Sequence, residues 1–179
     1  MSPQPILHFW FSELTPQQHF AKDATLDESI RTRFGPTLDA AARCELFAWR
    51  ATPEGRLAEI LVLDQFSRNV YRDTARAFAQ DALALALAQE LVASGQDRNL
   101  PTAQRVFAYM PYMHSESALI HEQALELFAQ PGMENNLDFE RRHKAIIDRF
   151  GRYPHRNAVL GRSSTPEELA FLSGPGSSF

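Results

Sequence analysis

Some ionisable side chains in the sequence fall where an amphipathic helix would carry apolar residues. In the predicted helix 53–66, a rotation of about 100° per residue places Asp64 in the middle of the face defined by Leu57 and Leu61. One further helical turn places Arg68 on the same face, four residues after Asp64, where the two side chains can form an ion pair. Because a buried carboxylate is costly unless it is paired, this spacing predicts a buried Asp64–Arg68 pair.

The predicted helix 116–129 also carries polar residues close to its apolar face. With Leu119 as the reference position, Glu116 falls on the side that should face the core. His121 falls on the opposite side of the wheel, so we expect it to be exposed or to lie on a flank.

The predicted helix 137–150 places a histidine inside its apolar stripe. If Phe139 faces the core, His143 lies about 40° from it and Arg149 lies along one edge of the stripe. Three helices therefore carry a charged or titratable residue on the face that should be buried. Two interpretations are open: these residues satisfy one another as a structural network, or they border a ligand pocket.

Basic residues are concentrated near the C-terminal end of the sequence. Residues 141–162 contain seven arginines and lysines but a single acidic residue, Asp148, in a chain whose net charge is −4. The run 149–157 within this segment leaves a helix at Gly151 and turns at Pro154. Arginines on such a loop are suited to binding an anion, but they could equally hold the loop against carboxylates of neighbouring helices.

Composition excludes several classes of function. The net charge of −4 argues against a general nucleic-acid-binding protein, and no apolar run is long enough to span a membrane. The start of the chain lacks the basic segment of a secretory signal, and the single Cys44 cannot form an intramolecular disulfide, so we expect a cytoplasmic protein. No zinc signature, phosphate-binding glycine loop or serine elbow is present, so we predict no metal and no cofactor.

Helix signals cover almost the whole sequence. Threonine–proline pairs at 15–16, 52–53 and 165–166 predict helix starts, whereas Gly35, Gly95 and Gly151 predict helix ends. No sustained alternating run of β-branched residues predicts a strand. The predicted helices span residues 6–11, 16–21, 27–34, 37–49, 53–66, 74–94, 102–109, 116–129, 137–150 and 166–172. The short connections favour one all-α domain over residues 1–179, an array of antiparallel helix pairs in which 173–179 form a non-helical tail.

The sequence resembles a bacterial family known as domain of unknown function 924. The likeness covers nearly the whole chain and rests on Phe9-Trp10-Phe11, Leu63–Asn69, Ala77-Phe78-Ala79, Tyr109–Glu116, Arg149–Asn157, Leu160–Glu168 and Pro175–Phe179. One departure is Ser67, where the family more often has proline. The resemblance implies an all-helical fold similar to tetratricopeptide-like arrays, and it implies no reaction, cofactor or catalytic residue.

Two functional hypotheses remain beside a purely structural network. The first is a binding module for an anionic small molecule or an acidic peptide terminus, with donors and polar companions at Gln65, Arg68, Asn69, His114, Arg149, Arg152, Arg156 and Asn157. The second is an enzyme acting on a phosphorylated or carboxylated metabolite, in which His143 or His155 is the acid or base and Glu116 or Asp64 orients it. The missing nucleotide and nucleophile motifs favour the first. The sequence does not predict the oligomeric state.

Overall fold

The computed structural model describes residues 1–177, and over this range the chain forms helices and turns without a β-strand. The predicted all-α class is therefore confirmed. The α-helices in chain order are α1 (Gln4–His8), α2 (Ala24–Ala42), α3 (Pro53–Leu61), α4 (Ser67–Val70), α5 (Asp81–Ala93), α6 (Thr102–Met113), α7 (Ala118–Phe128), α8 (Glu134–Phe150) and α9 (Pro166–Leu172). Wide π-helical turns span Phe9–Glu13 and Val62–Phe66. Short 3-10 turns span Phe47–Ala51, Ala75–Phe78, Gln96–Asn99 and Pro154–Arg156.

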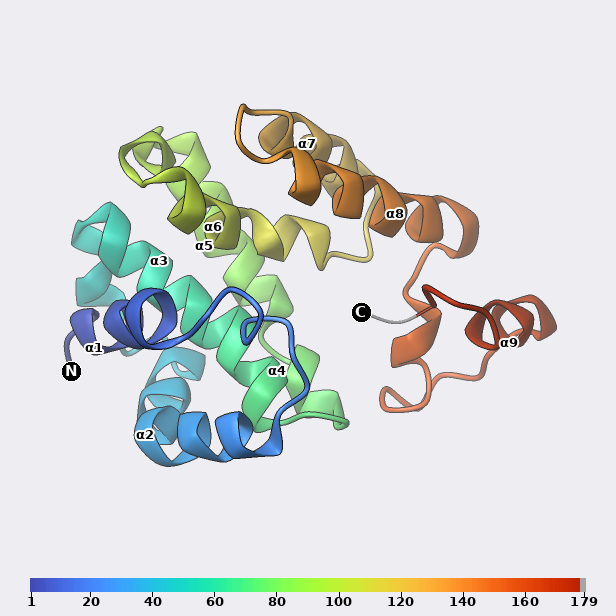
Figure 1. Ribbon diagram of the computed structural model, residues 1–179, viewed down its shortest axis with the longest axis horizontal. Helices are drawn as coiled ribbons and strands as arrows, with labels where there is room; N and C mark the ends of the chain where they lie inside the picture. The colour runs from blue at the N-terminus through green and yellow to red at the C-terminus, as the bar shows by residue number, and fades with distance from the viewer. Residues whose placement is uncertain (178–179) are drawn as a thin grey trace.

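The helices are arranged in two parts along the long axis of the molecule. Figure 1 shows α1–α6 gathered in one half, whereas α7 and α8 lie side by side above the middle and α9 lies at the far end. Helix α7 packs between α6 and α8, so it joins the two parts. A tetratricopeptide-like arrangement of these pairs and the single-domain boundary at 1–179 both stay predictions.

Local sequence signals set several of the helix ends. The Thr52 hydroxyl accepts a hydrogen bond from the Gly55 amide (3.1 Å) at the start of α3. The helix start predicted at 165–166 is confirmed, and Thr165 forms a capping box with Glu168 at the start of α9. Gly151 follows α8 with a φ of +67°, a left-handed conformation that glycine adopts without steric cost.

Two predicted boundaries are wrong because tertiary packing decides them. Helix α2 does not end at Gly35 but continues through Pro36. Ile30, Phe34 and Leu38 follow one another at four-residue spacing and are all buried, so their burial outweighs the backbone hydrogen bond that proline removes.

The predicted helix 16–21 is also wrong, because residues 16–20 form turns instead. Thr15 and Gln18 make the predicted cap contact, with 2.9 Å between the Thr15 amide and Gln18 Oε1. The segment is held by His19, whose ring stacks on Trp10 at 4.7 Å and whose Nε2 lies 2.7 Å from the Trp10 carbonyl oxygen. These contacts hold the segment against the core in a turn conformation instead of a helix.

The main apolar core lies among α1–α6. Trp10 and Phe66 are fully buried at its centre, and Phe66 stacks on Phe34 with 5.3 Å between ring centroids. No helix within residues 1–177 has both the length and the apolar character needed to cross a membrane. Residues 173–177 form turns, and the rest of the predicted tail, 178–179, lies outside the described residues.

Candidate functional site

Asp64 and Arg68 lie on one continuous helical segment made of α3, the π-helical turn Val62–Phe66 and α4. All five residues of that turn are buried, and the Asp64 side chain has no exposed surface. The predicted ion pair is confirmed, with 3.1 Å between Arg68 Nη1 and Asp64 Oδ1. Single π-helical turns often occur at functional sites, because they shift which side chains share a face.

Asp64 receives two further partners that the helix wheel did not identify. Gln65 Nε2 donates to Asp64 Oδ2 at 2.6 Å, and His114 Nδ1 lies 2.7 Å from Asp64 Oδ1. Burial alone would raise the pKa of the Asp64 carboxyl, but the charge of Arg68 and the hydrogen bonds from His114 and Gln65 hold that pKa well below its usual range. Asp64 is therefore a carboxylate despite its burial.

His114 directly follows α6, which carries it to the carboxylate of Asp64. Burial and the nearby Arg68 guanidinium lower the pKa of His114, although the Asp64 carboxylate opposes this shift. The imidazole is then neutral at pH 7 and donates its Nδ1 proton to Asp64. Its Nε2 is left as a proton acceptor, the same orientation that a carboxylate imposes on a catalytic histidine.

Arg68 and Arg156 share one carboxylate, Asp81, the first residue of α5. Arg68 donates to both Asp81 oxygens, at 2.9 and 3.0 Å, whereas Arg156 Nη1 reaches Asp81 Oδ2 at 3.3 Å. Arg156 Nη2 also donates to the His114 carbonyl oxygen at 3.0 Å. We call Asp64, Arg68, Asp81, His114 and Arg156 the charged cluster. Nothing in the sequence singles out Asp81, because an acidic residue at a helix start is common.

Arg156 is the least compensated member of the charged cluster. Its side chain is buried, and its Nε–H has no hydrogen-bond acceptor among residues 1–177. Burial lowers the pKa of Arg156, and repulsion by the Arg68 guanidinium lowers it further. Both guanidinium groups lie over the Phe78 ring, at 4.6 Å for Arg156 and 5.6 Å for Arg68.

Glu116 holds the C-terminal loop against the rest of the protein. It lies before α7 rather than on it, so its predicted place on that helix is wrong. Its carboxylate accepts a hydrogen bond from the Tyr153 amide (2.8 Å) and two from Arg162 (2.6 and 2.9 Å). Glu116 therefore fixes the segment that positions Arg156.

Histidine rings surround the fully buried Tyr153. The ring centroids of His143 and His155 lie 5.8 and 5.5 Å from that of Tyr153. Burial lowers the pKa of His143 to about 3 and that of His155 to about 4, so both are neutral at pH 7. The predicted inward position of His143 is confirmed, and its Nδ1 lies 2.8 Å from the Phe139 carbonyl oxygen.

The prediction for His121 is wrong. Its side chain is completely buried, and its Nδ1 lies 2.6 Å from Glu140 Oε1, a residue that the sequence analysis missed. The error came from the reference residue, because Leu119 is 71% exposed. The buried stripe of α7 runs through His121, Ala124 and Phe128, whose three- and four-residue spacing could have revealed it.

Of the predicted ligand-binding residues, Gln65 borders the charged cluster through Asp64, whereas four others lie away from it. Asn69 binds Asp27 (2.7 Å), and Arg149 pairs with Glu167 at the surface (2.8 Å). In the C-terminal loop, Arg152 pairs with Glu168 (2.6 Å), and Asn157 binds Arg162 and Ser164 (both 3.0 Å). The basic excess of 141–162 is thus largely balanced by acids from distant parts of the chain.

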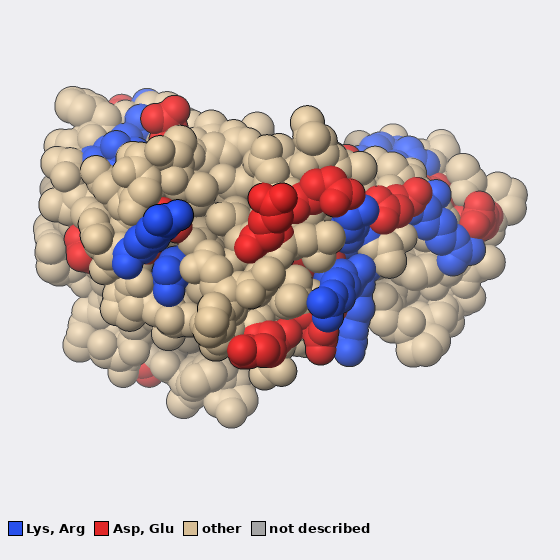
Figure 2. All heavy atoms as spheres, turned by 90° about the horizontal axis from the view of Figure 1, so that it is seen from above, with Lys and Arg blue, Asp and Glu red and all other residues tan. Residues whose placement is uncertain are grey.

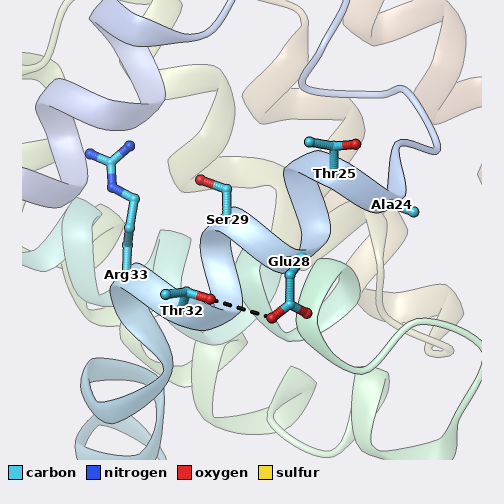
Figure 3. A pocket seen from close by; sticks show the side chains of 6 residues that line it. All are labelled: Ala24, Thr25, Glu28, Ser29, Thr32 and Arg33. Carbon is cyan, nitrogen blue, oxygen red and sulfur yellow. Dashed lines mark hydrogen bonds between the residues drawn. The ribbon is translucent and has the colours of Figure 1, made fainter.

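Two other surface features do not add to this site. A hollow of about 560 Å³ is lined by six residues of α2 alone, and Figure 3 shows Thr32 bonded to Glu28 within it. On the face drawn in Figure 2, acidic and basic side chains lie next to one another instead of forming a patch of one sign. Within the described residues, no three histidine, cysteine or acidic side chains converge to hold a metal ion.

Comparison with known proteins places the chain in a family. A family model described as "Bacterial protein of unknown function (DUF924)" matches residues 6–176, so the chain belongs to that family. A solved structure of the protein of unknown function ATU0120 from Agrobacterium tumefaciens is 39% identical, with 96% of each chain covered and a TM-score of 0.91. No curated protein matches the chain.

Proposed function

We propose that the protein is a binding module and that its charged cluster takes the carboxylate or phosphate group of a small anionic molecule. The observation that carries this proposal is the buried Arg156 guanidinium, whose Nε–H has no acceptor among residues 1–177. A buried donor that is left without an acceptor costs roughly 1–3 kcal/mol, and more when it belongs to a charged group. A bound oxyanion would supply the missing acceptor.

The charges around Arg156 and the solvent exposure of the charged cluster both support this proposal. Asp81 already accepts two bonds from Arg68, so its contact with Arg156 is the longest of the three. An oxyanion would offset the repulsion between the two guanidinium groups, which bind such groups with strong, directional hydrogen bonds. Arg68 and Asp81 each expose 20% of their side chains, and His114 exposes 16%, so solvent reaches one side of the cluster. The carboxylate end of a peptide has the same chemistry.

Nuclear magnetic resonance of the arginine Nε–H groups tests the proposal directly. We expect the Arg156 signal of ¹⁵N-labelled protein to shift saturably on titration with inorganic phosphate, succinate or a short peptide with a free C-terminus. The amidated form of that peptide should have no effect. Native mass spectrometry of freshly purified protein should show a retained small anion.

Two variants separate binding from stability. Arg156→Lys keeps one positive charge but loses the Nε–H and the planar group, so saturable binding should disappear while the fold is retained. Arg43→Lys is the matched control, because Arg43 forms an exposed two-bond pair with Glu45. If no probe shifts the Arg156 signal and Arg156→Lys only lowers the melting temperature, the network is structural and the proposal fails.

A second candidate function, an enzyme acting on a carboxylated or phosphorylated metabolite, is favoured by the geometry of His114. Its Nε2 is the accepting nitrogen of an imidazole oriented by Asp64, and Arg156 lies against the same residue through the His114 carbonyl oxygen. A substrate held by its anionic group at Arg156 would place a neighbouring proton within reach of Nε2. His114 thereby replaces His143 and His155 as the preferred acid–base residue, with Asp64 as the orienting carboxylate.

A turnover screen with phosphorylated and carboxylated metabolites separates the two candidates. An enzyme would lose turnover in His114→Asn and in Asp64→Asn while still binding its substrate. Turnover that survives His114→Asn would contradict this role for the imidazole. Binding without turnover for every compound would leave the binding module as the function.

A further inference from the structure

A groove separate from the charged cluster lies between α8 and α9. It encloses about 500 Å³ and is lined mainly by apolar and basic side chains, among them Phe139, Arg142, Ile146, Arg149, Phe150 and Phe171. This volume lies within the range of small-molecule sites, which is roughly 300–1,000 Å³.

The residues that the structure describes leave part of the apolar lining exposed. Phe139 is 49% exposed, although the wheel of α8 placed it toward the core, so that prediction is wrong. Phe150 and Phe171 meet across the groove with 5.1 Å between ring centroids, and Ile146 forms the buried floor. A half-exposed aromatic ring beside a preformed apolar groove is a feature of binding surfaces.

The two arginines on the rim differ in how they are paired. Arg149 forms a salt bridge with Glu167 (2.8 Å). Arg142 lies over the Phe139 ring at 5.4 Å and forms no salt bridge with any carboxylate in the described part of the chain. Its neighbour Arg141, on the same helix, pairs with Asp138 at 3.0 Å. Arg142 is thus the groove arginine that is open to an anionic partner.

We propose that this groove binds a single-chain amphiphile that ends in one carboxylate, as a fatty acid does. The carboxylate would pair with Arg142, and the hydrocarbon chain would lie over Ile146, Phe150 and Phe171. From residue 142 to residue 150 the helix rises about 12 Å, which gives the chain a continuous apolar floor. An acidic helical partner fits less well, because it would bring several carboxylates to a groove with one unpaired cation.

Calorimetric titration of the protein with decanoate, below its micelle concentration, tests the proposal. Decanol is the matched uncharged probe. We expect decanoate to bind at least tenfold more tightly than decanol. Arg142→Gln should remove this difference, whereas Arg141→Gln, one residue away and also exposed, should leave it unchanged.

A second pair of variants tests the apolar part of the site. Phe139→Ser should weaken decanoate binding severalfold, and Leu119→Ser, which alters an exposed leucine on α7, should not. Equal binding of decanoate and decanol, unchanged binding by Arg142→Gln, or no binding at all would overturn the proposal. So would a dimer in sedimentation velocity that Phe139→Ser dissociates, because the groove would then be covered by a second copy of the chain.

Discussion

The N-terminal and C-terminal halves of this protein are held together by different forces. The half built from α1–α6 is organised around a large apolar core that includes Trp10, Phe34 and Phe66. From the start of α8 to residue 177, the buried apolar residues form a second, small cluster of Ile146, Ile147 and Tyr153. Arginines of this region form ion pairs with Asp81 and Glu116 from earlier in the chain and with Glu167 and Glu168 of α9.

This difference has a physical consequence. Apolar burial depends little on pH or salt, whereas ion pairs weaken when a carboxylate is protonated or when salt screens the charges. The C-terminal loop, which carries Arg156 into the charged cluster, should therefore respond to solution conditions that leave the main core intact. The five predictions that follow test this contrast, beginning with the largest expected effect.

Truncating a core ring should destabilise the whole protein. Phe34 is 5% exposed and packs on Phe66 and Phe9, so we expect Phe34→Ala to lower the free energy of unfolding by about 3–5 kcal/mol. Chemical denaturation measures this loss, and hydrogen exchange should show faster opening along α2–α6. A loss below about 1 kcal/mol would mean that the apolar core does not dominate stability in this half.

Removing the anchor of the C-terminal loop should have a smaller and local effect. Glu116→Gln weakens the bonds to Arg162 and to the Tyr153 amide, at a cost of about 1–3 kcal/mol. Hydrogen exchange should increase over residues 150–165 and stay unchanged in α2 and α3. A double-mutant cycle with Arg162→Gln measures the coupling, and full additivity would argue against a direct pair.

Acidification should destabilise the protein through its buried histidines. The pKa values of His143 and His155 are lowered to about 3 and about 4, so the unfolded chain binds protons below pH 6.5 that the folded chain does not. The free energy of unfolding should therefore fall as the pH is lowered from about 7 to 4. The melting temperature of His143→Gln should depend less steeply on pH than that of the unmodified protein. His8→Gln is the control variant, because His8 is exposed.

At still lower pH, the carboxylate of Glu168, which pairs with Arg152 of the C-terminal loop, should also become protonated. Hydrogen bonds from Arg152 and the Thr165 amide lower the pKa of Glu168 to about 2. Its contribution to stability is present above the ordinary carboxyl range and is lost as the pH falls toward about 2. Because Glu168 lies on α9, this loss of stability should be seen as faster hydrogen exchange around α9.

The smallest effect should come from an exposed pair at the surface of the N-terminal half. Arg43 and Glu45 expose 60% and 52% of their side chains, so Arg43→Gln should leave the melting temperature unchanged within error. A clear loss of stability would show that surface pairs matter in the N-terminal half as well. The contrast between the two halves would then be weaker than the structure indicates.

Local signals in the sequence predicted much of the fold. The caps at Thr52 and Thr165 and the left-handed Gly151 are short-range features, so their residue types alone determine them. The signals failed at Gly35 and at 16–21, where burial of Phe34 and the stacking of His19 on Trp10 decide the backbone. Long-range packing is not encoded in a local pattern.

The candidate site was predictable only in part. Asp64 and Arg68 lie four residues apart, so helical periodicity placed the pair correctly. Asp81 lies 13 residues after its partner Arg68 in the sequence, and Arg156 lies 75 residues after Asp81. Helical periodicity does not relate residues that are so far apart in the sequence. The choice of Leu119 and Phe139 as inward residues also failed, because a helix wheel gives relative angles and not the direction of the core.

The sequence by itself determined the all-α class, several helix ends and the buried Asp64–Arg68 pair, because each depends on interactions within a few residues. Only the tertiary structure decided which acid each arginine of 141–162 meets, which face of α7 is buried, and that His114 rather than His143 lies against Asp64. These outcomes depend on how the helices pack, and a local pattern of charges does not specify packing over tens of residues.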